Sequence, residues 1–198
     1  MAQDLTGKVV LVTGASRGTG RALARGVAAD GANAVAFAHS TNDLRETTQG
    51  DTEHFLAIVG DVTVEADVDH VVTAAHQRFG RIDVLVNNAG ISSRGKLLAR
   101  PFADWAEVIR VNLLGLALCT HRVLPGMIVR GCRRVINVAS RIAEFPLPKA
   151  SAYAASKAGV ISLTRALAAE VGGGRVTGGV STAHGTKSTS RPDRSGKP

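Results

Sequence analysis

Short apolar runs alternate with segments of helical periodicity along the first 171 residues of the chain. The apolar runs predict buried strands at 8–13, 33–38, 55–60, 84–87 and 134–138. The segments between them predict helices at 18–30, 42–49, 65–79, 101–111, 113–130 and 152–171. This alternation favours an α/β fold, a doubly wound parallel sheet with helices on both faces. Pro125 lies inside the fifth predicted helix and is expected to kink or shorten it.

The pattern stops near residue 172. The segment 172–198 is dominated by Gly, Ser, Thr and basic residues, and only a fragment at 175–177 could begin a sixth strand. Such a composition buries too little apolar surface to offset the entropy of ordering the chain. The 198-residue sequence therefore predicts a single folded α/β domain at 1–171 and a basic, disordered tail at 172–198.

Charge and hydropathy exclude several classes of protein. The formal net charge is +8, and the segment 172–198 holds five basic residues and one acidic residue. Basic patches attract nucleic acid and anionic lipid, but neither interleaved aromatic residues nor a nucleic-acid-binding motif accompanies these charges. No apolar run reaches the ~18 residues of a membrane span, and the N-terminus lacks a secretory signal. We expect a cytoplasmic protein that binds neither nucleic acid nor membrane.

Cysteine and histidine spacing gives no indication of a metal. Cys119 and Cys132 are too few for a disulfide framework, and the six histidines are scattered. The sequence contains no CxxC pair or His/Cys cluster of the kind that binds zinc. We therefore predict reduced thiols and no metal site.

A glycine-rich turn, TGASRGTG at 13–20, joins the first predicted strand to the first predicted helix. Glycines let the backbone turn sharply and approach a diphosphate, and the helix N-terminus supplies free N–H groups. A purely structural strand-to-helix turn has similar residues, but the position directly after the first strand favours dinucleotide binding. The predicted cofactor-binding residues of this turn are Gly14, Ser16, Arg17, Gly18, Thr19 and Gly20.

The end of the second predicted strand distinguishes between cofactors. An acidic residue there would hold the ribose 2′-hydroxyl of NAD, whereas the first carboxylate after the second predicted strand of this chain is Asp43. Arg17 lies within the glycine turn, where a guanidinium can pair with a 2′-phosphate. The sequence therefore favours NADP(H), with NAD(H) as the alternative; Arg17 facing solvent would leave the preference open.

Two further segments follow predicted strands. Asp61 and Val62 follow the third strand, where the carboxylate could accept from an adenine amino group or cap the next helix, or do both. The run NNAG at 87–90 follows the fourth strand, and small residues there allow close approach of a cofactor. Asn88, Ala89 and Gly90 are predicted to contact the cofactor, and at least one of the two asparagines is expected to tie neighbouring strands together.

Tyr153 and Lys157 form a YxxxK pair at the start of the last predicted helix, and Tyr153 is the only tyrosine in the chain. Positions i and i+4 share one face of a helix. An ammonium beside a phenol favours the phenolate and makes the tyrosine a usable proton donor or acceptor. Such a pair alone often decorates a helix surface, but Ser140 lies 13 residues upstream in NVAS and the glycine turn opens the chain. We interpret the combination as a site for general acid/base chemistry.

Six motifs stand in one order along the chain: TGASRGTG, DVT, NNAG, VNLLG, NVAS and YAASK. In this order the sequence resembles the short-chain dehydrogenase/reductase family, in particular its 3-oxoacyl-acyl-carrier-protein reductase type. The resemblance covers about residues 5–171. It implies a Rossmann-type sheet that binds NAD(P) and an enzyme that interconverts a carbonyl and a secondary alcohol by hydride transfer.

The resemblance also implies roles for individual residues. Tyr153 would be the general acid/base, Lys157 would stabilise the phenolate and bind the nicotinamide ribose, and Ser140 would bond the substrate oxygen. Asn112, in a helix break between Val111 and Leu113, would hold a proton-relay water. The segment 141–151, with Ile142, Phe145 and Leu147, would offer apolar contacts to a small carbonyl or alcohol substrate, and Ser92–Lys96 would form the opposite wall.

Family members continue beyond the last predicted helix with further strands and a substrate loop, which this sequence does not show. We therefore expect a family member lacking the last strand or strands, C-terminally truncated, either by a reading-frame shift or as a natural short variant. The alternative function is a truncated, inactive nucleotide-binding member without turnover. The resemblance further implies a homodimer through the helices at 113–130 and 152–171, with Leu116, Ile161 and Leu167 as candidate contacts.

Overall fold

The computed structural model describes residues 5–131, 134–171 and 175–180, the last of these as backbone, and contains one parallel sheet. The six strands lie in the order β3-β2-β1-β4-β5-β6, and each neighbouring pair is parallel. This is the order of a doubly wound dinucleotide-binding sheet, as the sequence predicts. The strands are β1 (Val9–Thr13), β2 (Asn33–Ala38), β3 (Phe55–Val59), β4 (Val84–Asn87), β5 (Arg134–Ala139) and β6 (Arg175–Val180).

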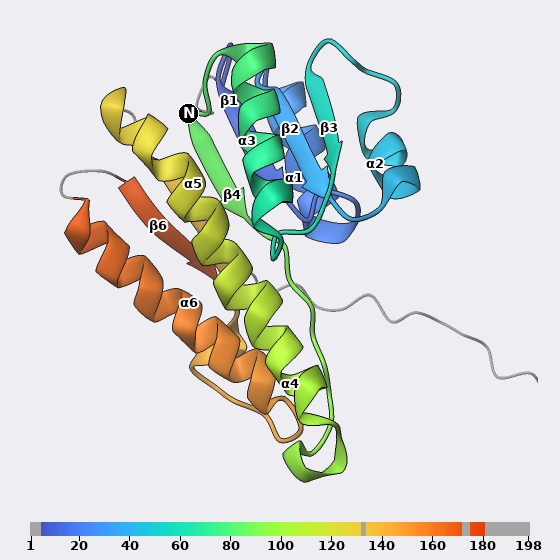
Figure 1. Cartoon of the computed structure of the whole chain (residues 1–198), viewed down its shortest axis with the longest axis vertical. Helices are drawn as coiled ribbons and strands as arrows, with labels where there is room; N and C mark the ends of the chain where they lie inside the picture. The colour runs from blue at the N-terminus through green and yellow to red at the C-terminus, as the bar shows by residue number, and fades with distance from the viewer. Residues whose placement is uncertain (1–4, 132–133, 172–174, 181–198) are drawn as a thin grey trace, which may run out of the picture.

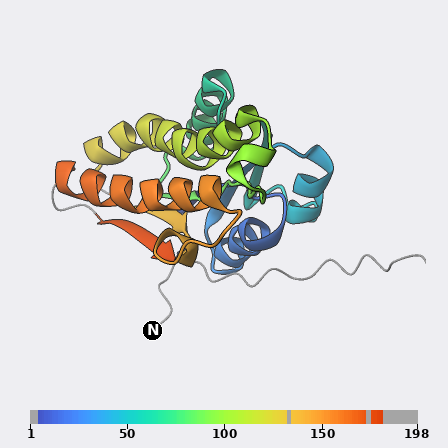
Figure 2. The same ribbon diagram turned by 90° about the horizontal axis from the view of Figure 1, so that it is seen from below.

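Helices cover both faces of the sheet (Figures 1 and 2). Helices α1 (Gly18–Ala29) and α2 (Thr41–Thr48) lie on one face. On the opposite face lie α3 (Glu65–Phe79), α5 (Leu116–Val129) and α6 (Ser151–Glu170). Helix α4 (Phe102–Ile109) continues into α5 through the π-helical segment η2 (Arg110–Gly115). Two short 3-10 turns, Leu97–Ala99 and Arg141–Ala143, flank the carboxyl edge of the sheet.

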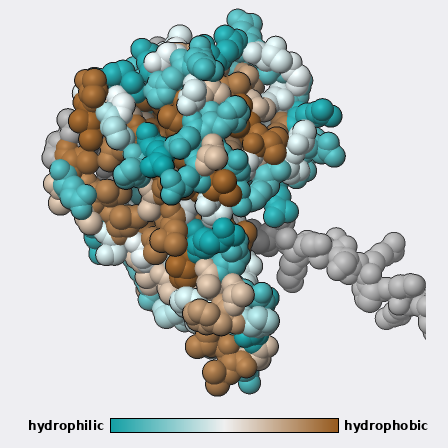
Figure 3. Space-filling view, in the orientation of Figure 1, coloured by the Kyte–Doolittle hydropathy of each residue, from teal (hydrophilic) through white to brown (hydrophobic). Residues whose placement is uncertain are grey.

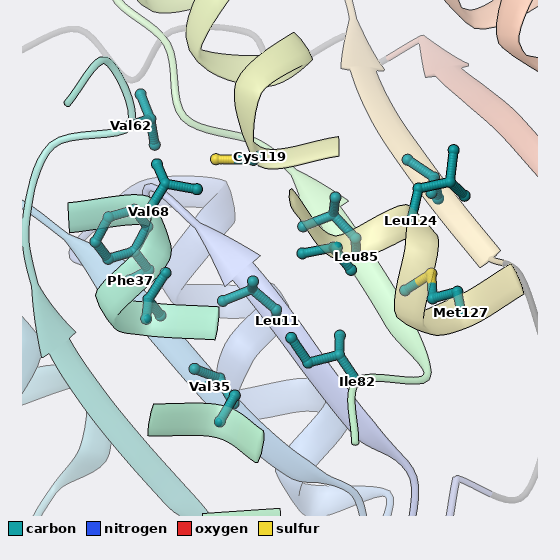
Figure 4. Packing of buried hydrophobic residues seen from close by; sticks show 14 of the residues in the cluster. Leu11, Val35, Phe37, Val62, Val68, Ile82, Leu85, Cys119, Leu124 and Met127 are labelled. Atoms are coloured by element: carbon teal, nitrogen blue, oxygen red, sulfur yellow. The ribbon is translucent and has the colours of Figure 1, made fainter. Parts of the chain in front are cut away.

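Strand residues alternate between two hydrophobic cores. Leu11 and Val35 point toward α3 and α5, where they pack with Met127 and its neighbours (Figure 4). The intervening residues Val10 and Ala34 pack against α1 and α2 on the other face. Because both faces are covered, the central strands are continuously apolar, which explains why the sequence showed unbroken hydrophobic runs.

Local signals set most element ends within one or two residues of their predicted positions. Ser40 caps α2 by accepting a hydrogen bond from the Asp43 N–H at 3.3 Å. Gly80 ends α3 in the left-handed conformation, with φ at 76°. Pro125 was predicted to kink or shorten its helix; the shortening is wrong, because α5 continues through the proline to Val129. Buried Val123, Leu124 and Met127 on either side of the proline anchor that stretch.

The predicted boundary at residue 171 also needs correction. Strand β6 lies inside the range assigned to the tail and pairs in parallel with β5 along its whole length, from Arg175 beside Arg134 to Val180 beside Ala139. The fragment at 175–177 therefore does begin a sixth strand. The remainder of the predicted tail, 172–174 and 181–198, lies outside the described residues.

The long helical stretch Phe102–Val129 is long and apolar enough to cross a membrane by length and composition, with a mean hydropathy of 1.3, although the sequence analysis expected no such segment. Half of its most apolar window is buried within the protein. It packs against α3 and α6 and carries charged residues such as Arg110 and Arg122. These are the properties of a helix that packs within the protein, in the layer of helices that covers one face of the sheet.

Candidate active site and nucleotide groove

The glycine turn after β1 is shaped by its missing side chains. Gly14 adopts φ at 66°, and a Cβ atom there would lie 2.8 Å from the Cα of Ala89. A Cβ atom on Gly20, in the first turn of α1, would lie 2.1 Å from the carbonyl oxygen of Gly14. The turn and α1 therefore approach each other more closely than any larger residue permits.

Asn88 and Thr13 lock this turn onto the end of β4. The Asn88 side-chain amide donates to the carbonyl oxygens of Thr13 at 3.0 Å and Gly14 at 3.3 Å. The Thr13 hydroxyl oxygen accepts from the backbone N–H groups of Asn88 and Ala89 at 3.1 and 3.0 Å. The crossing point between β1 and β4, where the order of the sheet reverses, is thus held by side-chain-to-backbone bonds.

Asn87 has the structural role expected of one of the two asparagines. Its amide donates to the Thr120 hydroxyl on α5 and to the Asn137 side chain on β5, both at 2.9 Å. Asn137 in turn donates to the Thr164 hydroxyl on α6 at 2.9 Å. All four residues are buried, so a polar chain runs through the apolar layer from α5 to α6.

A groove of about 460 Å³ runs along the glycine turn, at the carboxyl ends of β1 and β2. It is fit for a dinucleotide, because α1 begins without an acidic residue in its first turn and without a side-chain cap from Arg17, leaving its N-terminal N–H groups for an anion. Most of the predicted cofactor residues line this groove: Gly14, Ser16, Arg17, Thr19, Gly20, Val62, Asn88, Ala89 and Gly90.

The part of the groove beside the end of β2 contains residues that the sequence analysis did not select. His39, Ser40 and Asp43 line it together with Arg17. Arg21 lies 4.0 Å from the Asp43 carboxylate and 2.9 Å from that of Glu46, which balances the negative charge on α2. The sequence feature that could have identified His39, Ser40 and Asp43 is their position just after the second predicted strand.

Asp61 does not line the groove, although its neighbours Gly60 and Val62 do. One carboxylate oxygen accepts from the backbone N–H and the hydroxyl of Thr63, both at 2.8 Å, and the other lies 3.5 Å from His39 Nε2. Burial opposes ionisation of Asp61, but the hydrogen bonds from Thr63 and the proximity of His39 and Arg110 outweigh it and lower the pKa of this carboxyl. Val64, rather than Asp61, is the N-cap residue of α3, so Asp61 stabilises the turn before the helix.

A second groove, of about 500 Å³, contains the predicted catalytic residues Ser140, Tyr153 and Lys157. It shares Thr19, Asn88, Gly90 and Ile91 with the first groove, so the two form one continuous depression across the sheet's carboxyl edge. Ser140 directly follows β5, and Tyr153 and Lys157 lie in the first two turns of α6. The i, i+4 spacing brings the two side chains together: Lys157 Nζ lies 5.8 Å from the centre of the Tyr153 ring.

Lys157 is almost completely buried, with 4% of its surface exposed. Its ammonium donates to the carbonyl oxygen of Val138 at 2.6 Å. Burial lowers the pKa of Lys157 from its ordinary value of 10.5 to about 8. The site therefore holds a cation that is costly to bury and that no carboxylate in the described part of the chain neutralises.

Asn112 lies in the π-helical segment η2, at the predicted helix break. Its side chain is fully occupied by protein partners. The amide oxygen accepts from the Ile91 N–H at 2.8 Å, and the amide nitrogen donates to the Ile91 carbonyl at 2.9 Å and to the Ser156 hydroxyl at 3.0 Å. Asn112 thus joins the loop after β4 to helix α6, and π-helical insertions of this kind are frequent at functional sites.

The predicted substrate contacts are only partly brought together. Ile142 and Leu147 line the second groove, whereas Phe145 does not and is 60% exposed, with the Arg141 guanidinium 5.2 Å from its ring centre. Arg94 lines the opposite wall. Ile91, Ser92, Ser93, Val138, Ala139 and Ala150 complete the lining.

Comparison with known proteins agrees with this arrangement. A family model described as short chain dehydrogenase matches residues 8–192. The chain belongs to the short-chain dehydrogenase family. It is 37% identical over 182 residues to a 3-oxoacyl-[acyl-carrier-protein] reductase of Synechocystis sp., a match that covers 87% of this chain and 72% of that protein.

Solved structures of the short-chain dehydrogenase family have the same fold. Levodione reductase superposes with a TM-score of 0.84 at 37% identity, over 88% of this chain and 70% of that one. The 3-ketoacyl-(acyl-carrier-protein) reductase of Brucella melitensis, solved with NADH, gives a TM-score of 0.83 at 34% identity, over 88% and 75% of the two chains. The chain is therefore an oxidoreductase of a family that binds nicotinamide cofactors.

Proposed function

We propose that this short-chain dehydrogenase is an NADP(H)-dependent oxidoreductase that interconverts a carbonyl and a secondary alcohol, with Tyr153 as general acid/base. The observation that carries the proposal is the meeting of Ser140, Tyr153 and Lys157 in one groove that shares its wall with the dinucleotide groove. A substrate in the second groove would lie beside a cofactor in the first.

The chain's own residues account for the proton and for charge on the substrate oxygen. The Ser140 oxygen accepts from the Ile142 N–H at 3.3 Å, which leaves its hydroxyl proton to bond a substrate oxygen. In the reductive direction Tyr153 donates a proton to that oxygen, and Ser140 stabilises the charge developing there. The Lys157 ammonium favours the phenolate that Tyr153 leaves behind. When bound, the reduced cofactor supplies the hydride.

The preference for NADP(H) is supported by charge at the adenosine end. Arg17 is exposed and lines the groove, and His39 lies beside it. The carboxylate that also lines this end, Asp43, lies 4.0 Å from Arg21. A 2′-phosphate would meet the Arg17 guanidinium, whereas a free ribose hydroxyl would find only a carboxylate that already lies close to Arg21.

The test is oxidation of NADPH by the purified chain over a panel of ketones and acetoacetyl thioesters, with Tyr153→Phe as the matched variant. We expect turnover in the native chain and a loss of at least about a hundredfold in the variant. Equal turnover in both would exclude the tyrosine mechanism. NADPH binding without turnover on any substrate would support the alternative, an inactive nucleotide-binding member.

We further propose a homodimer through α5 and α6. An apolar groove of about 500 Å³ lies between these helices, lined by residues that include Leu124, Ile128 and Leu163, and Figure 3 shows hydrophobic residues gathered on this part of the surface. Leu167 lines it as the sequence analysis suggested, but Leu116 is a core residue, only 5% exposed. Light scattering that finds only monomer at high concentration would contradict the dimer.

The proposal also includes a cytoplasmic location for the protein and a small molecule as its substrate.

A further inference from the structure

Ser156 lies between Tyr153 and Lys157 on α6, and it is completely buried. Its hydroxyl donates to the carbonyl oxygen of Tyr153, one turn back, at 2.8 Å. With its only proton committed there, the oxygen can serve Asn112 only as an acceptor, and the Asn112 amide nitrogen lies 3.0 Å away.

This arrangement fixes which way the Asn112 amide faces. The amide nitrogen points toward Ser156 and the Ile91 carbonyl, and the amide oxygen points toward the Ile91 N–H. A flipped amide would place a donor against the Ile91 N–H and an acceptor against its carbonyl, and both bonds would be lost. Ser156 therefore adds an acceptor that favours the same amide orientation as the Ile91 backbone.

Ile91 and its neighbour Gly90 form the wall common to the dinucleotide groove and the catalytic groove. A Cβ atom on Gly90 would lie 3.2 Å from the Asn112 amide oxygen, so this wall packs directly on the asparagine. The same region of α6 is seated closely on η2, since a Cβ atom on Gly159 would lie 2.8 Å from a methyl group of Leu113. The wall is thus coupled to the helix that carries Tyr153 and Lys157.

We propose that Ser156 is a positioning residue of this site: through Asn112 it holds the wall at Gly90 and Ile91 in register with the catalytic helix. The proposal rests on the proposed function for the identity of the ligand. It implies that Ser156 affects the part of a dinucleotide that lies beside Ile91, and not the part that lies beside Arg17 and His39, at the far end of the groove.

The experiment compares two ligands on the Ser156→Ala variant by equilibrium titration. NADPH would span the whole groove, and adenosine 2′,5′-bisphosphate would fill only the adenosine end. We expect affinity for NADPH to fall about tenfold, the effect of leaving a buried amide N–H without its acceptor, and affinity for the bisphosphate to stay within about twofold. Ser162→Ala, an exposed serine on the same helix, is the matched control and should change neither affinity.

Amide hydrogen exchange of the ligand-free protein provides a second measurement that does not depend on cofactor binding. The Ile91 N–H bonds to Asn112, so we expect its exchange to accelerate in Ser156→Ala but not in Ser162→Ala. Ser156→Cys, which keeps a weak acceptor, should give intermediate values if the alanine variant folds poorly.

The outcomes separate this proposal from the proposed function. Native protein that binds neither ligand, together with faster Ile91 exchange in the variant, would reject the cofactor and retain the positioning role. Equal losses of affinity for both ligands would indicate a general structural role and overturn the proposal. Unchanged NADPH affinity with unchanged Ile91 exchange would also overturn it.

Discussion

The ammonium of Lys157 lies 5.8 Å from the centre of the Tyr153 ring and donates to the carbonyl oxygen of Val138. One helical turn therefore places a cation beside the phenol, and among the described residues the ammonium has a single hydrogen-bond acceptor, the Val138 carbonyl on β5. Burial of an ammonium with a single neutral partner is unfavourable, and such costs are characteristic of functional sites. The cost should be measurable.

Lys157→Met is predicted to change how stability depends on pH. Because burial lowers the pKa of Lys157 from 10.5 to about 8, the unfolded chain between these values holds a proton that the folded chain has lost. The free energy of unfolding of the native protein should therefore rise across this window, relative to the variant, by up to about 3 kcal/mol. Below about pH 8 both states carry the proton and the difference between the two proteins should be flat.

Urea unfolding at a series of pH values measures this difference directly. Lys8→Met, which removes an exposed lysine just before β1, is the control for the loss of one lysine charge. A native-minus-variant difference that stays constant from pH 8 to 10.5 would show that Lys157 keeps an ordinary affinity for its proton in the folded protein.

Gly20→Ala is predicted to damage the dinucleotide groove. The new Cβ atom would lie 2.1 Å from the Gly14 carbonyl oxygen, so the turn and α1 must separate. Overpacking of this kind costs typically 1–3 kcal/mol, and we expect weaker NADPH binding as well as lower stability (~1–3 kcal/mol). Gly26→Ala is the matched control on the same helix, because a Cβ atom there meets nothing within 4 Å.

The control substitution should change the stability of the protein in the opposite direction. Alanine is favoured over glycine inside a helix by up to about 1 kcal/mol, so Gly26→Ala should be neutral or stabilising and should bind NADPH as the native chain does. Thermal unfolding and NADPH titration of the two variants give the comparison. Similar behaviour of both would mean that the close approach at Gly20 does not restrict the turn.

The sequence predicted the sheet, its helices and most of the two grooves, because these depend on local signals. Continuous apolar strands, glycines at forced turns and the i, i+4 pair of Tyr153 and Lys157 are all visible in a single sequence. Contacts between distant segments could not be predicted from the sequence alone. Nothing near Ser156 indicates that its partner is Asn112, 44 residues away, and nothing near Asp61 shows that its carboxylate serves the Thr63 turn. These roles exist only once α6 packs on η2 and β3 leads into α3.

Strand β6 is a second feature that the sequence alone did not predict. Its sequence RVTGGV has little apolar periodicity, so composition assigned it to a tail. In the sheet it pairs with β5 along six residues, and pairing with a neighbour compensates for weak intrinsic propensity.

Thr164→Val is predicted to destabilise the protein, because it interrupts the buried hydrogen-bond network of Thr164, Asn137 and Asn87. The Thr164 hydroxyl accepts from the Asn137 amide at 2.9 Å, and Asn137 is completely buried. Valine keeps the shape but leaves a buried donor unsatisfied, at a cost of about 1–3 kcal/mol, whereas Thr164→Ser keeps the hydroxyl. Urea unfolding should therefore rank the serine variant above the valine variant; the reverse order would mean that the bond to Asn137 adds nothing to stability.

Arg17→Gln is predicted to reduce the preference for NADPH over NADH. Arg17 is the exposed cation of the glycine turn and has no ion-pair partner among the described residues, so its guanidinium is available for a 2′-phosphate. A charge-assisted hydrogen bond contributes about 1.5–3 kcal/mol, which corresponds to a loss of roughly ten- to a hundredfold in NADPH affinity with NADH affinity nearly unchanged.

Arg165→Gln removes the same charge from α6, outside both grooves, and controls for net charge. Titration of both cofactors against both variants at two salt concentrations makes the comparison. Parallel losses for NADPH and NADH in Arg17→Gln would assign Arg17 to the diphosphate instead, and the cofactor preference would then have to come from His39 and its neighbours at the end of β2.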